Sequence, residues 1–203
     1  METRDFERFT MLLYVGNSTT SIHLSNLAKH QGPALIDVLN QERGEQFVDI
    51  GAYCIMPNHL HLALREKKTG GISAFMQKIG TGYTMYFNKK YNRTGALFSG
   101  RFKARHVATD AYFNRLINYI HANPAELFEP NWKQGLIKDE KSTAAKLLQY
   151  PYSSLPDFEN KARIQNKIVN IDATLSITDR KPSLSTVFED ALTFNSHEES
   201  FEE

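Results

Sequence analysis

Two strands joined by a tight turn are encoded in residues 47–65, which read FVDIGAYCIMPNHLHLALR. The run Phe47–Ile55 is rich in apolar, β-branched and aromatic residues, which is typical of a buried strand. Proline and asparagine at positions 57 and 58 favour a turn that returns the chain as an antiparallel neighbour. His59–Arg65 then forms the second strand, with leucines at alternate positions. We therefore place a β-hairpin at the centre of the fold.

Further strands and helices are predicted on both sides of this hairpin. The apolar run Phe9–Val15 predicts another strand, and Arg105–Thr109 is taken as a fourth. Helices are expected at Pro33–Gln41, over the apolar periodicity from Ile72 to Phe87, and from Ala111 to about His121. The order β-α-β-β-α-β-α is a split β-α-β arrangement. It predicts an α+β protein with a ferredoxin-like antiparallel sheet, helices on one face and a C-terminal extension.

The net charge of +1 hides an uneven distribution along the chain. Residues 1–150 carry 19 basic and 13 acidic side chains, whereas residues 151–203 carry 5 and 10. Residues 65–105 alone hold ten basic side chains against one acid, with seven aromatic residues between them. This composition suits a nucleic-acid backbone with stacked bases, although a solvated helix face with core aromatics is the alternative. The predicted DNA contacts are Lys78, Lys89, Lys90, Arg93, Arg101, Phe102, Lys103 and Arg105.

Length and composition limit the domain organisation and exclude several classes of protein. A chain of 203 residues suits one compact domain with an appendage, and we place a catalytic domain at residues 1–155. Residues 156–203 are expected to be an accessory, acidic extension, partly disordered. The single cysteine, Cys54, excludes a disulfide framework and a cysteine-built zinc site. Apolar runs are too short to span a bilayer, so a cytoplasmic protein without membrane contact is expected.

Two histidines on the second strand form the first candidate site. Side chains two apart on a strand share a face, so His59 and His61 project together from the face opposite the leucines. Two imidazoles placed in this way can converge on one divalent metal ion. The alternative is an exposed pair on a wet sheet face.

The last predicted helix carries the second candidate site. Tyr119 and Asn123 are four residues apart and share a helix face with Tyr112. A tyrosine beside a metal ion can attack a phosphate, provided that a base or cation assists its ionisation. The alternatives are a helix-flank aromatic residue for Tyr119 and a C-terminal cap for Asn123. His121 points elsewhere on an ideal helix and is expected to be structural or to contact substrate.

Taken in order, these motifs resemble those of a known family. The segments Met56–Leu62 (MPNHLHL) and Tyr119–Pro124 (YIHANP) resemble the single-tyrosine HUH transposases, particularly the REP-associated tyrosine transposases. Gly95–Lys103 resembles the basic, aromatic link of that family, and Tyr150–Ser154 (YPYSS) resembles its closing motif. The resemblance covers roughly residues 5–155, while the stretch Phe9–Leu24 departs from the usual start of the family.

The resemblance implies both the residues and the reaction. His59 and His61 would bind a divalent metal, Mg²⁺ or Mn²⁺, with Asn123 as the third ligand and Tyr119 as the nucleophile. The implied enzyme is a transposase that nicks and rejoins single-stranded DNA at hairpin-associated sites through a 5′-phosphotyrosine. Its partner would be single-stranded or hairpin DNA in the nucleoid, bound by a monomer or a homodimer. No nucleotide cofactor is expected, because the sequence lacks a phosphate-binding loop motif.

A non-enzymatic interpretation stays open beside this one. A ferredoxin-like sheet with a basic, aromatic surface can bind single-stranded nucleic acid without cutting it. Formation of a covalent DNA adduct by Tyr119 separates the two interpretations.

Overall fold

The computed structural model describes residues 1–27, 32–159, 162–178, 182 and 186–199, the last five of these as backbone only. The chain divides into two compact units. Unit 1 comprises Met1–Asp49 and Leu64–Arg105, and unit 2 comprises Ile50–Ala63 and His106–Glu203. This division does not coincide with the domain boundary expected after residue 155, which stays a prediction. Parts of the extension expected to be disordered, including residues 179–181 and 183–185, lie outside the described residues.

The predicted hairpin is confirmed. Strand β1 (Val48–Ile55) pairs with strand β2 (Leu60–Glu66), and β1 is buried along its whole length. The turn closes through a hydrogen bond that the Met56 amide donates to the His59 carbonyl oxygen at 2.9 Å. The two strands contribute residues to both units. The α+β class is therefore correct, with a two-stranded antiparallel sheet in the described part of the chain.

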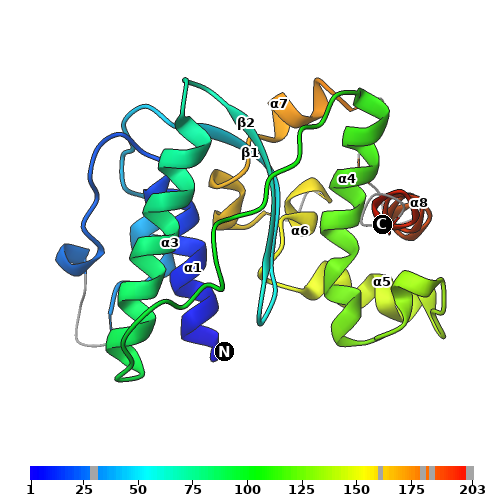
Figure 1. Ribbon diagram of the computed structural model, residues 1–203, viewed down its shortest axis with the longest axis horizontal. Coiled ribbons are helices and arrows are strands. Elements are labelled where there is room, and N and C mark those ends of the chain that lie inside the picture. The colour runs from blue at the N-terminus through cyan, green and yellow to red at the C-terminus, as the bar shows by residue number, and fades with distance from the viewer. Residues whose placement is uncertain (28–31, 160–161, 179–181, 183–185, 200–203) are drawn as a thin grey trace. The chain divides into compact units, whose positions relative to one another are not determined.

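Helices make up the rest of unit 1. They are α1 (Thr3–Gly16), the short 3₁₀ turn η1 (Leu24–Leu27), α2 (Leu35–Leu39) and α3 (Gly71–Lys90). Helix α1 packs against α2 and α3, and Figure 1 shows α1 and α3 side by side. The helix predicted from Ile72 to Phe87 is confirmed as part of α3, and two internal glycines do not break it. One of them, Gly82, faces Leu12 of α1 with little room for a side chain.

The strand predicted at Phe9–Val15 is wrong, because these residues lie in α1. A continuous apolar run fits a buried strand and a helix buried on all sides equally well. Here every residue from Phe9 to Gly16 is buried. The deciding signal lies upstream, where Glu2 and Asp5 form a capping box that starts the helix.

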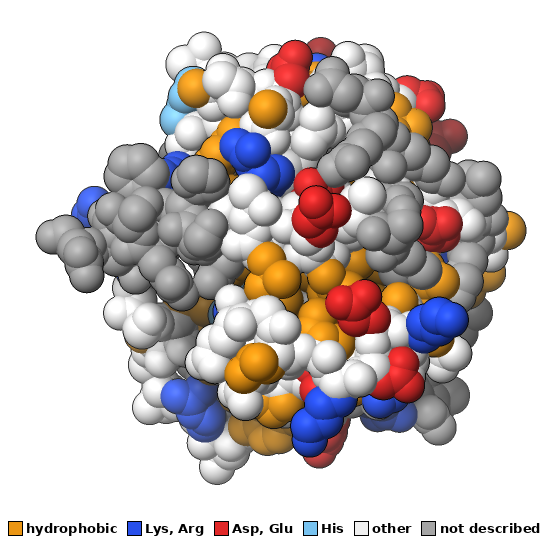
Figure 2. Space-filling view, turned by 90° about the vertical axis from the view of Figure 1, so that its right-hand side faces the viewer, with side chains coloured by type: hydrophobic (Ala, Val, Ile, Leu, Met, Phe, Trp, Pro, Cys, Tyr) orange, Lys and Arg blue, Asp and Glu red, His pale blue; other side chains and the backbone are white. Residues whose placement is uncertain are grey.

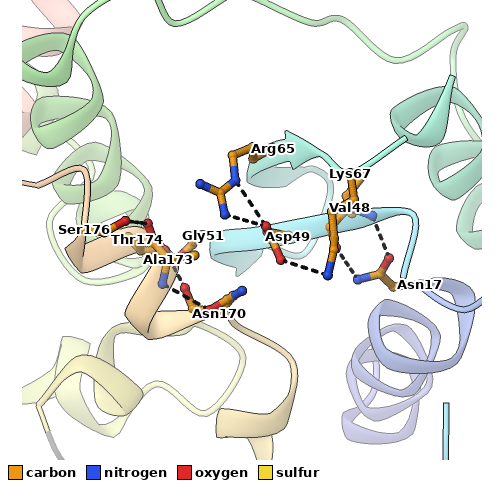
Figure 3. A network of polar contacts seen from close by, with 10 residues as sticks. All are labelled: Asn17, Val48, Asp49, Gly51, Arg65, Lys67, Asn170, Ala173, Thr174 and Ser176. Atoms are coloured by element: carbon orange, nitrogen blue, oxygen red, sulfur yellow. Dashed lines mark hydrogen bonds and ion pairs between the residues drawn. The ribbon is translucent and has the colours of Figure 1, made fainter. Parts of the chain in front are cut away.

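Polar contacts tie the end of α1 to the start of β1. The Asn17 side chain donates through Nδ2 to the Val48 carbonyl oxygen at 2.8 Å. Its Oδ1 atom accepts from the backbone N–H groups of Phe47 and Val48, at 3.0 Å each. Figure 3 shows Asn17 beside Val48, and next to them the Arg65 guanidinium donating to Asp49 at 2.7 Å. These bonds satisfy backbone groups at the entry of β1, which would otherwise be buried without partners.

The strand predicted at Arg105–Thr109 is also wrong. These residues form an irregular, largely exposed segment before α4. A strand requires a hydrogen-bonded neighbour, and the predicted N-terminal strand is a helix. The four-stranded, ferredoxin-like sheet is thus not confirmed, since the described residues form two strands.

Unit 2 is built around one long helix that covers the hairpin. Helix α4 (Asp110–Ala122) begins where predicted, with the Thr109 hydroxyl accepting from the Tyr112 amide at 3.2 Å. Its buried Ile117 and Ile120 pack on small hairpin side chains, including Cys54, in one apolar cluster. The elements that follow are η2 (Asn123–Leu127), η3 (Trp132–Gln134), α5 (Glu140–Gln149), α6 (Leu155–Phe158), η4 (Ile164–Lys167), α7 (Ile171–Leu175) and α8 (Val187–Glu199).

The predicted closing motif, Tyr150–Ser154, runs along the edge of β1. Cys54 and Ser153 form an antiparallel bridge, flanked by the bonds from Ile55 to Tyr152 (2.9 Å) and from Ser154 to Tyr53 (3.0 Å). The start of α7 covers the same strand further along, where the Asn170 amide donates to the Ile50 carbonyl oxygen at 2.9 Å. Figure 3 shows this end of α7 next to Gly51. The edge of β1 is therefore protected.

A second apolar cluster joins α8 to the end of α4. It contains buried residues from α4, η2, η3, α5, α6 and α8, including Trp132, Leu147, Phe188 and Ala191. Figure 1 shows α8 (red) beside α4 (green). On the face seen in Figure 2, hydrophobic side chains lie among acidic and basic ones.

Candidate metal and tyrosine site

The two histidines of the predicted pair lie against each other in unit 2. His59 ends the turn and His61 lies on β2, and their rings meet edge-on with centroids 4.8 Å apart. The Oδ1 atom of Asn58 lies 2.7 Å from Nδ1 of His59. Because an amide oxygen only accepts hydrogen bonds, this contact places the proton on Nδ1 and leaves the Nε2 lone pair available to a ligand.

Burial keeps both rings in the neutral form. It lowers the pKa of His61 to about 4, with smaller contributions from the nearby charges of His59 and Lys133, while Asn123 opposes the shift. Burial also lowers the pKa of His59, where Lys133 acts in the same direction and Glu126 opposes it. A metal ion binds the neutral imidazole, so both rings are ready to act as ligands at neutral pH.

Helix α4 brings Tyr119 and Asn123 to this pair. The Tyr119 ring lies edge-on to the His61 ring, with centroids 5.7 Å apart. Asn123 directly follows α4 and is fully buried, and its Nδ2 donates to the Tyr119 carbonyl oxygen at 2.7 Å. This bond caps the end of α4, which is the alternative role expected for Asn123, and it places the amide next to Tyr119. The structure brings His59, His61, Tyr119 and Asn123 together in one place.

Two polar atoms in this place are buried and make no hydrogen bond of normal geometry. They are Nε2 of His61 and Oδ1 of Asn123, both of which can donate a lone pair to a cation. Both atoms lie where the histidines meet the end of α4, so they are available to a cation bound there. Within the described part of the chain, no three His, Cys, Asp or Glu side chains form a metal-binding group. The side-chain amide of Asn123 adds an oxygen atom to the two imidazoles in this place.

Aromatic rings surround the half-buried Tyr119 side chain. The Phe194 ring of α8 lies 4.7 Å from it and the Trp132 ring of η3 lies 6.2 Å from it, both between centroids. Phe194 also contacts Tyr112, at 5.1 Å, so α8 follows the predicted Tyr112–Tyr119 stripe. This packing fixes the tyrosine ring beside the histidines.

His121 belongs to the core rather than to the site. It is fully buried, and its Nε2 lies 2.9 Å from the Ser154 hydroxyl oxygen. Burial lowers its pKa to about 3, with Arg163 acting in the same direction. Of the two roles expected for His121, the geometry fits the structural one.

The predicted DNA contacts lie in unit 1 and differ in their surroundings. Lys78 donates to the Ser18 carbonyl oxygen at 2.6 Å, and Lys90 bonds the Asp5 carboxylate at 2.7 Å. These two lysines hold the fold of unit 1 together. The other six side chains are exposed, namely Lys89, Arg93, Arg101, Phe102, Lys103 and Arg105.

Sequence reasoning missed the side chains that complete the surroundings of Tyr119. Trp132 is the only tryptophan of the chain and is fully buried, which is a signal that could have been used. Phe194 lies in the segment expected to be accessory, and no motif marks it. No motif marks Lys133 or Glu126, which contribute to the sequence pattern only through their charge.

Comparison with known proteins agrees with the geometry. Residues 25–123 match the family model described as transposase IS200 like, and this range includes His59, His61, Tyr119 and Asn123. Searches of curated proteins and of solved structures gave no significant match. None of the described helices is both long enough and apolar enough to cross a membrane. The match over residues 25–123, just under half of the chain, supports its assignment to the IS200-like transposase family.

Proposed function

We propose that this protein is a metal-dependent single-stranded DNA endonuclease and strand transferase of the single-tyrosine HUH class, with Tyr119 as its nucleophile. The match to the IS200-like family points to transposase-like DNA processing. The metal-dependent tyrosine chemistry is supported by the contact between the Tyr119 and His61 rings. It is also supported by two buried donor atoms, Nε2 of His61 and Oδ1 of Asn123. The resemblance to REP-associated tyrosine transposases supports hairpin-associated single strands as the substrate.

The donor set fits a divalent cation. His59 and His61 offer imidazole nitrogens and Asn123 an amide oxygen, a mixed set that suits Mg²⁺ or Mn²⁺ with positions left for water and phosphate. A cation bound there supplies positive charge to a phosphate held beside Tyr119. The neutral histidines and the buried Oδ1 of Asn123 support this assignment.

Tyr119 carries the covalent step. Its phenolic oxygen attacks the phosphorus, the bond to the 3′-oxygen breaks, and a 5′-phosphotyrosine remains while the 3′-oxygen leaves as a hydroxyl. The proton that the tyrosine loses is balanced by the proton that the leaving 3′-oxygen gains. Phe194 and Trp132 pack against the ring and limit its movement, which favours a single attacking geometry. Because the covalent bond conserves the phosphodiester energy, rejoining needs no nucleotide cofactor.

A covalent-trapping assay tests the proposal. The full-length protein is incubated with a single-stranded hairpin oligonucleotide and Mg²⁺ or Mn²⁺, and the products are separated on a denaturing gel. A 3′ label marks the covalent adduct, and a 5′ label marks the released strand. We expect an adduct with the native protein that is lost with Tyr119→Phe. Tyr112→Phe is the matched control, since Tyr112 lies on the same helix and also packs on Phe194. An adduct that survives Tyr119→Phe would contradict the assignment of the nucleophile.

The same assay separates the enzyme from a protein that only binds DNA. The double variant His59→Ala, His61→Ala should keep salt-sensitive binding of single strands and lose the adduct. If the native protein binds single-stranded DNA but never forms an adduct with any divalent cation, the non-enzymatic interpretation is correct.

A further inference from the structure

An ion pair lies beside the proposed site and has no role in the steps above. Glu126 is in η2, three residues after Asn123, and Lys133 is in η3. The Lys133 ammonium lies 3.3 Å from Oε2 of Glu126. Both side chains keep a substantial exposed fraction, 34% for Lys133 and 43% for Glu126. A pair that remains this accessible to water is weak and exchanges partners easily.

The backbone of Lys133 is anchored next to Tyr119. The preceding residue, Trp132, is fully buried, and its ring lies 6.2 Å from the Tyr119 ring between centroids. The Lys133 ammonium lies 5.9 Å from the centroid of the same indole ring. Gly135, in the left-handed conformation at φ 75°, ends η3 directly afterwards. The lysine therefore extends from a fixed point beside the indole ring of Trp132, with its side chain partly exposed.

The pair lies next to residues of the proposed site. Glu126 follows the buried Asn123 by three residues in η2. Lys133 directly follows Trp132, whose ring packs 6.2 Å from the Tyr119 ring between centroids. An ammonium group at this place has a use at a site for a phosphodiester.

We propose that Lys133 binds the scissile phosphate, and that Glu126 is the counter-ion that holds Lys133 at the site until DNA replaces it. This inference rests on the proposed function. A lysine ammonium is a compact positive charge that pairs with phosphate oxygens. When the Tyr119 oxygen bonds to phosphorus and the bond to the 3′-oxygen breaks, negative charge builds on the non-bridging oxygens. Lys133 stabilises that charge and stays protonated throughout.

The test uses full-length protein and one oligonucleotide in two forms. The scissile linkage is located from the length of the strand that the native protein releases. The second form carries a neutral methylphosphonate at that linkage. Adduct formation is timed with the normal strand, and binding of both strands is measured over a range of salt concentrations. The variants are Lys133→Gln, Lys133→Arg and Glu126→Gln, with Lys138→Gln as the control, because Lys138 is an exposed lysine five residues further on.

The expected results differ in direction between variants. Lys133→Gln slows adduct formation on the order of 100-fold. It also reduces the slope of log K against log salt by about 0.7, whereas Lys133→Arg retains most activity. The methylphosphonate weakens binding by the native protein but has little further effect on Lys133→Gln. Glu126→Gln binds the normal strand more tightly, by about 3-fold, because the competing carboxylate is gone. A folding defect could not produce this gain.

The experiment distinguishes a wrong role for Lys133 from a wrong activity for the protein. If the native protein forms the adduct but Lys133→Gln behaves like Lys138→Gln, Lys133 does not bind the phosphate and the proposed function stands. If Glu126→Gln weakens binding of the normal strand, the counter-ion role is wrong. If the native protein forms no adduct at all, the proposed function fails and Lys133 has no scissile phosphate to bind.

Discussion

The His61 ring meets the Tyr119 ring edge-on, with 5.7 Å between centroids, although the two residues come from a strand and a helix that are far apart in sequence. The contact exists because α4 packs its Ile117 and Ile120 on the small hairpin side chains beneath it. One core cluster thus sets the distance between the proposed metal ligand and the proposed nucleophile. The geometry of the site therefore depends on the packing of α4 against the hairpin.

Asn123 should be required for tight metal binding. Its Oδ1 is buried and makes no hydrogen bond of normal geometry, so Asn123→Ala removes a donor and lowers Mn²⁺ affinity by about tenfold or more, measured by titration calorimetry without DNA. Asn123→Asp keeps an oxygen donor and should bind Mn²⁺ at least as well as the native protein. Gln149→Ala, at an exposed position of α5, is the control. Equal Mn²⁺ affinity for Asn123→Ala and Gln149→Ala would remove Asn123 from the ligand set.

Phe194 should hold α8 onto the tyrosine helix. It is buried against Tyr119 and Tyr112, so Phe194→Ala leaves a cavity and costs about 3 kcal/mol of unfolding free energy. Urea unfolding of full-length protein measures the loss, and Leu136→Ala, with a side chain 60% exposed, is the comparison. A cost below about 1 kcal/mol would mean that α8 does not pack firmly on α4 in solution.

The sequence allowed the hairpin, α3 and α4 to be predicted because each carries a local signal. Alternating leucines, a Pro-Asn turn and a Thr109 cap act within a few residues, and the structure contains all of them. The run Phe9–Val15 failed because burial on every side erases the periodicity that separates helix from strand. Without that strand, residues 105–109 have no neighbour to pair with.

In the candidate site, too, only the features with a local signal could be predicted from the sequence. His59 and His61 are two residues apart and Tyr119 and Asn123 are four apart, so local geometry already places each pair on one face. That the two pairs meet could be inferred only from the family resemblance. Trp132 and Phe194 approach Tyr119 through packing between separate elements, for which no local spacing exists.

Ser154 should be a structural link between α4 and β1. Its hydroxyl oxygen lies 2.9 Å from Nε2 of His121 and accepts from the Tyr53 amide, also at 2.9 Å. Ser154→Ala leaves both buried groups without a partner, which costs about 2 to 4 kcal/mol of unfolding free energy. Urea unfolding measures the change, and Ser99→Ala at an exposed position should change stability by less than about 0.5 kcal/mol. Equal stability of the two variants would show that water or a rearrangement satisfies His121.

Asp5 should make the stability of unit 1 depend on acid. Burial raises its pKa, but hydrogen bonds from Lys90, Tyr91, the Glu2 amide and Tyr86 outweigh burial and hold the pKa below its usual value. Since the unfolded chain has the higher pKa, about 3.9, Asp5 stabilises the fold fully above that pH. This contribution is lost as the pH falls through the lower, folded-state value.

The test is Asp5→Asn, compared with the native protein by urea unfolding from pH 7 to pH 3. At pH 7 the variant should be less stable by about 1 to 3 kcal/mol, because Lys90, Tyr86 and Tyr91 lose hydrogen bonds to a carboxylate while Glu2 still pairs with Lys90. The difference should shrink as the pH is lowered. Glu42→Gln, at an exposed position of unit 1, should show no such difference at any pH. A gap that stays constant down to pH 3 would show that Asp5 is not the titrating group.

The segment between α3 and α4 should supply both charge and stacking to single-stranded DNA. Replacing Arg101, Lys103 and Arg105 together by glutamine should reduce the slope of log K against log salt by about 2, since each phosphate contact on a single strand contributes about 0.7. Phe102, with 43% of its side chain exposed, contributes through stacking. Phe102→Ala should therefore weaken binding by about 1 to 3 kcal/mol and leave the slope nearly unchanged.

Two kinds of contact thus give two separable signatures, one in the salt slope and one in the affinity at fixed salt. A control that removes the same number of charges elsewhere distinguishes a local contact from a general loss of positive charge. Such a control replaces three lysines of unit 2 by glutamine, namely Lys138, Lys141 and Lys146. If this control flattens the slope as much as the Arg101, Lys103 and Arg105 variant does, the DNA does not follow the segment between α3 and α4. If Phe102→Ala changes the slope rather than the affinity at fixed salt, Phe102 acts by positioning the neighbouring charges and not by stacking.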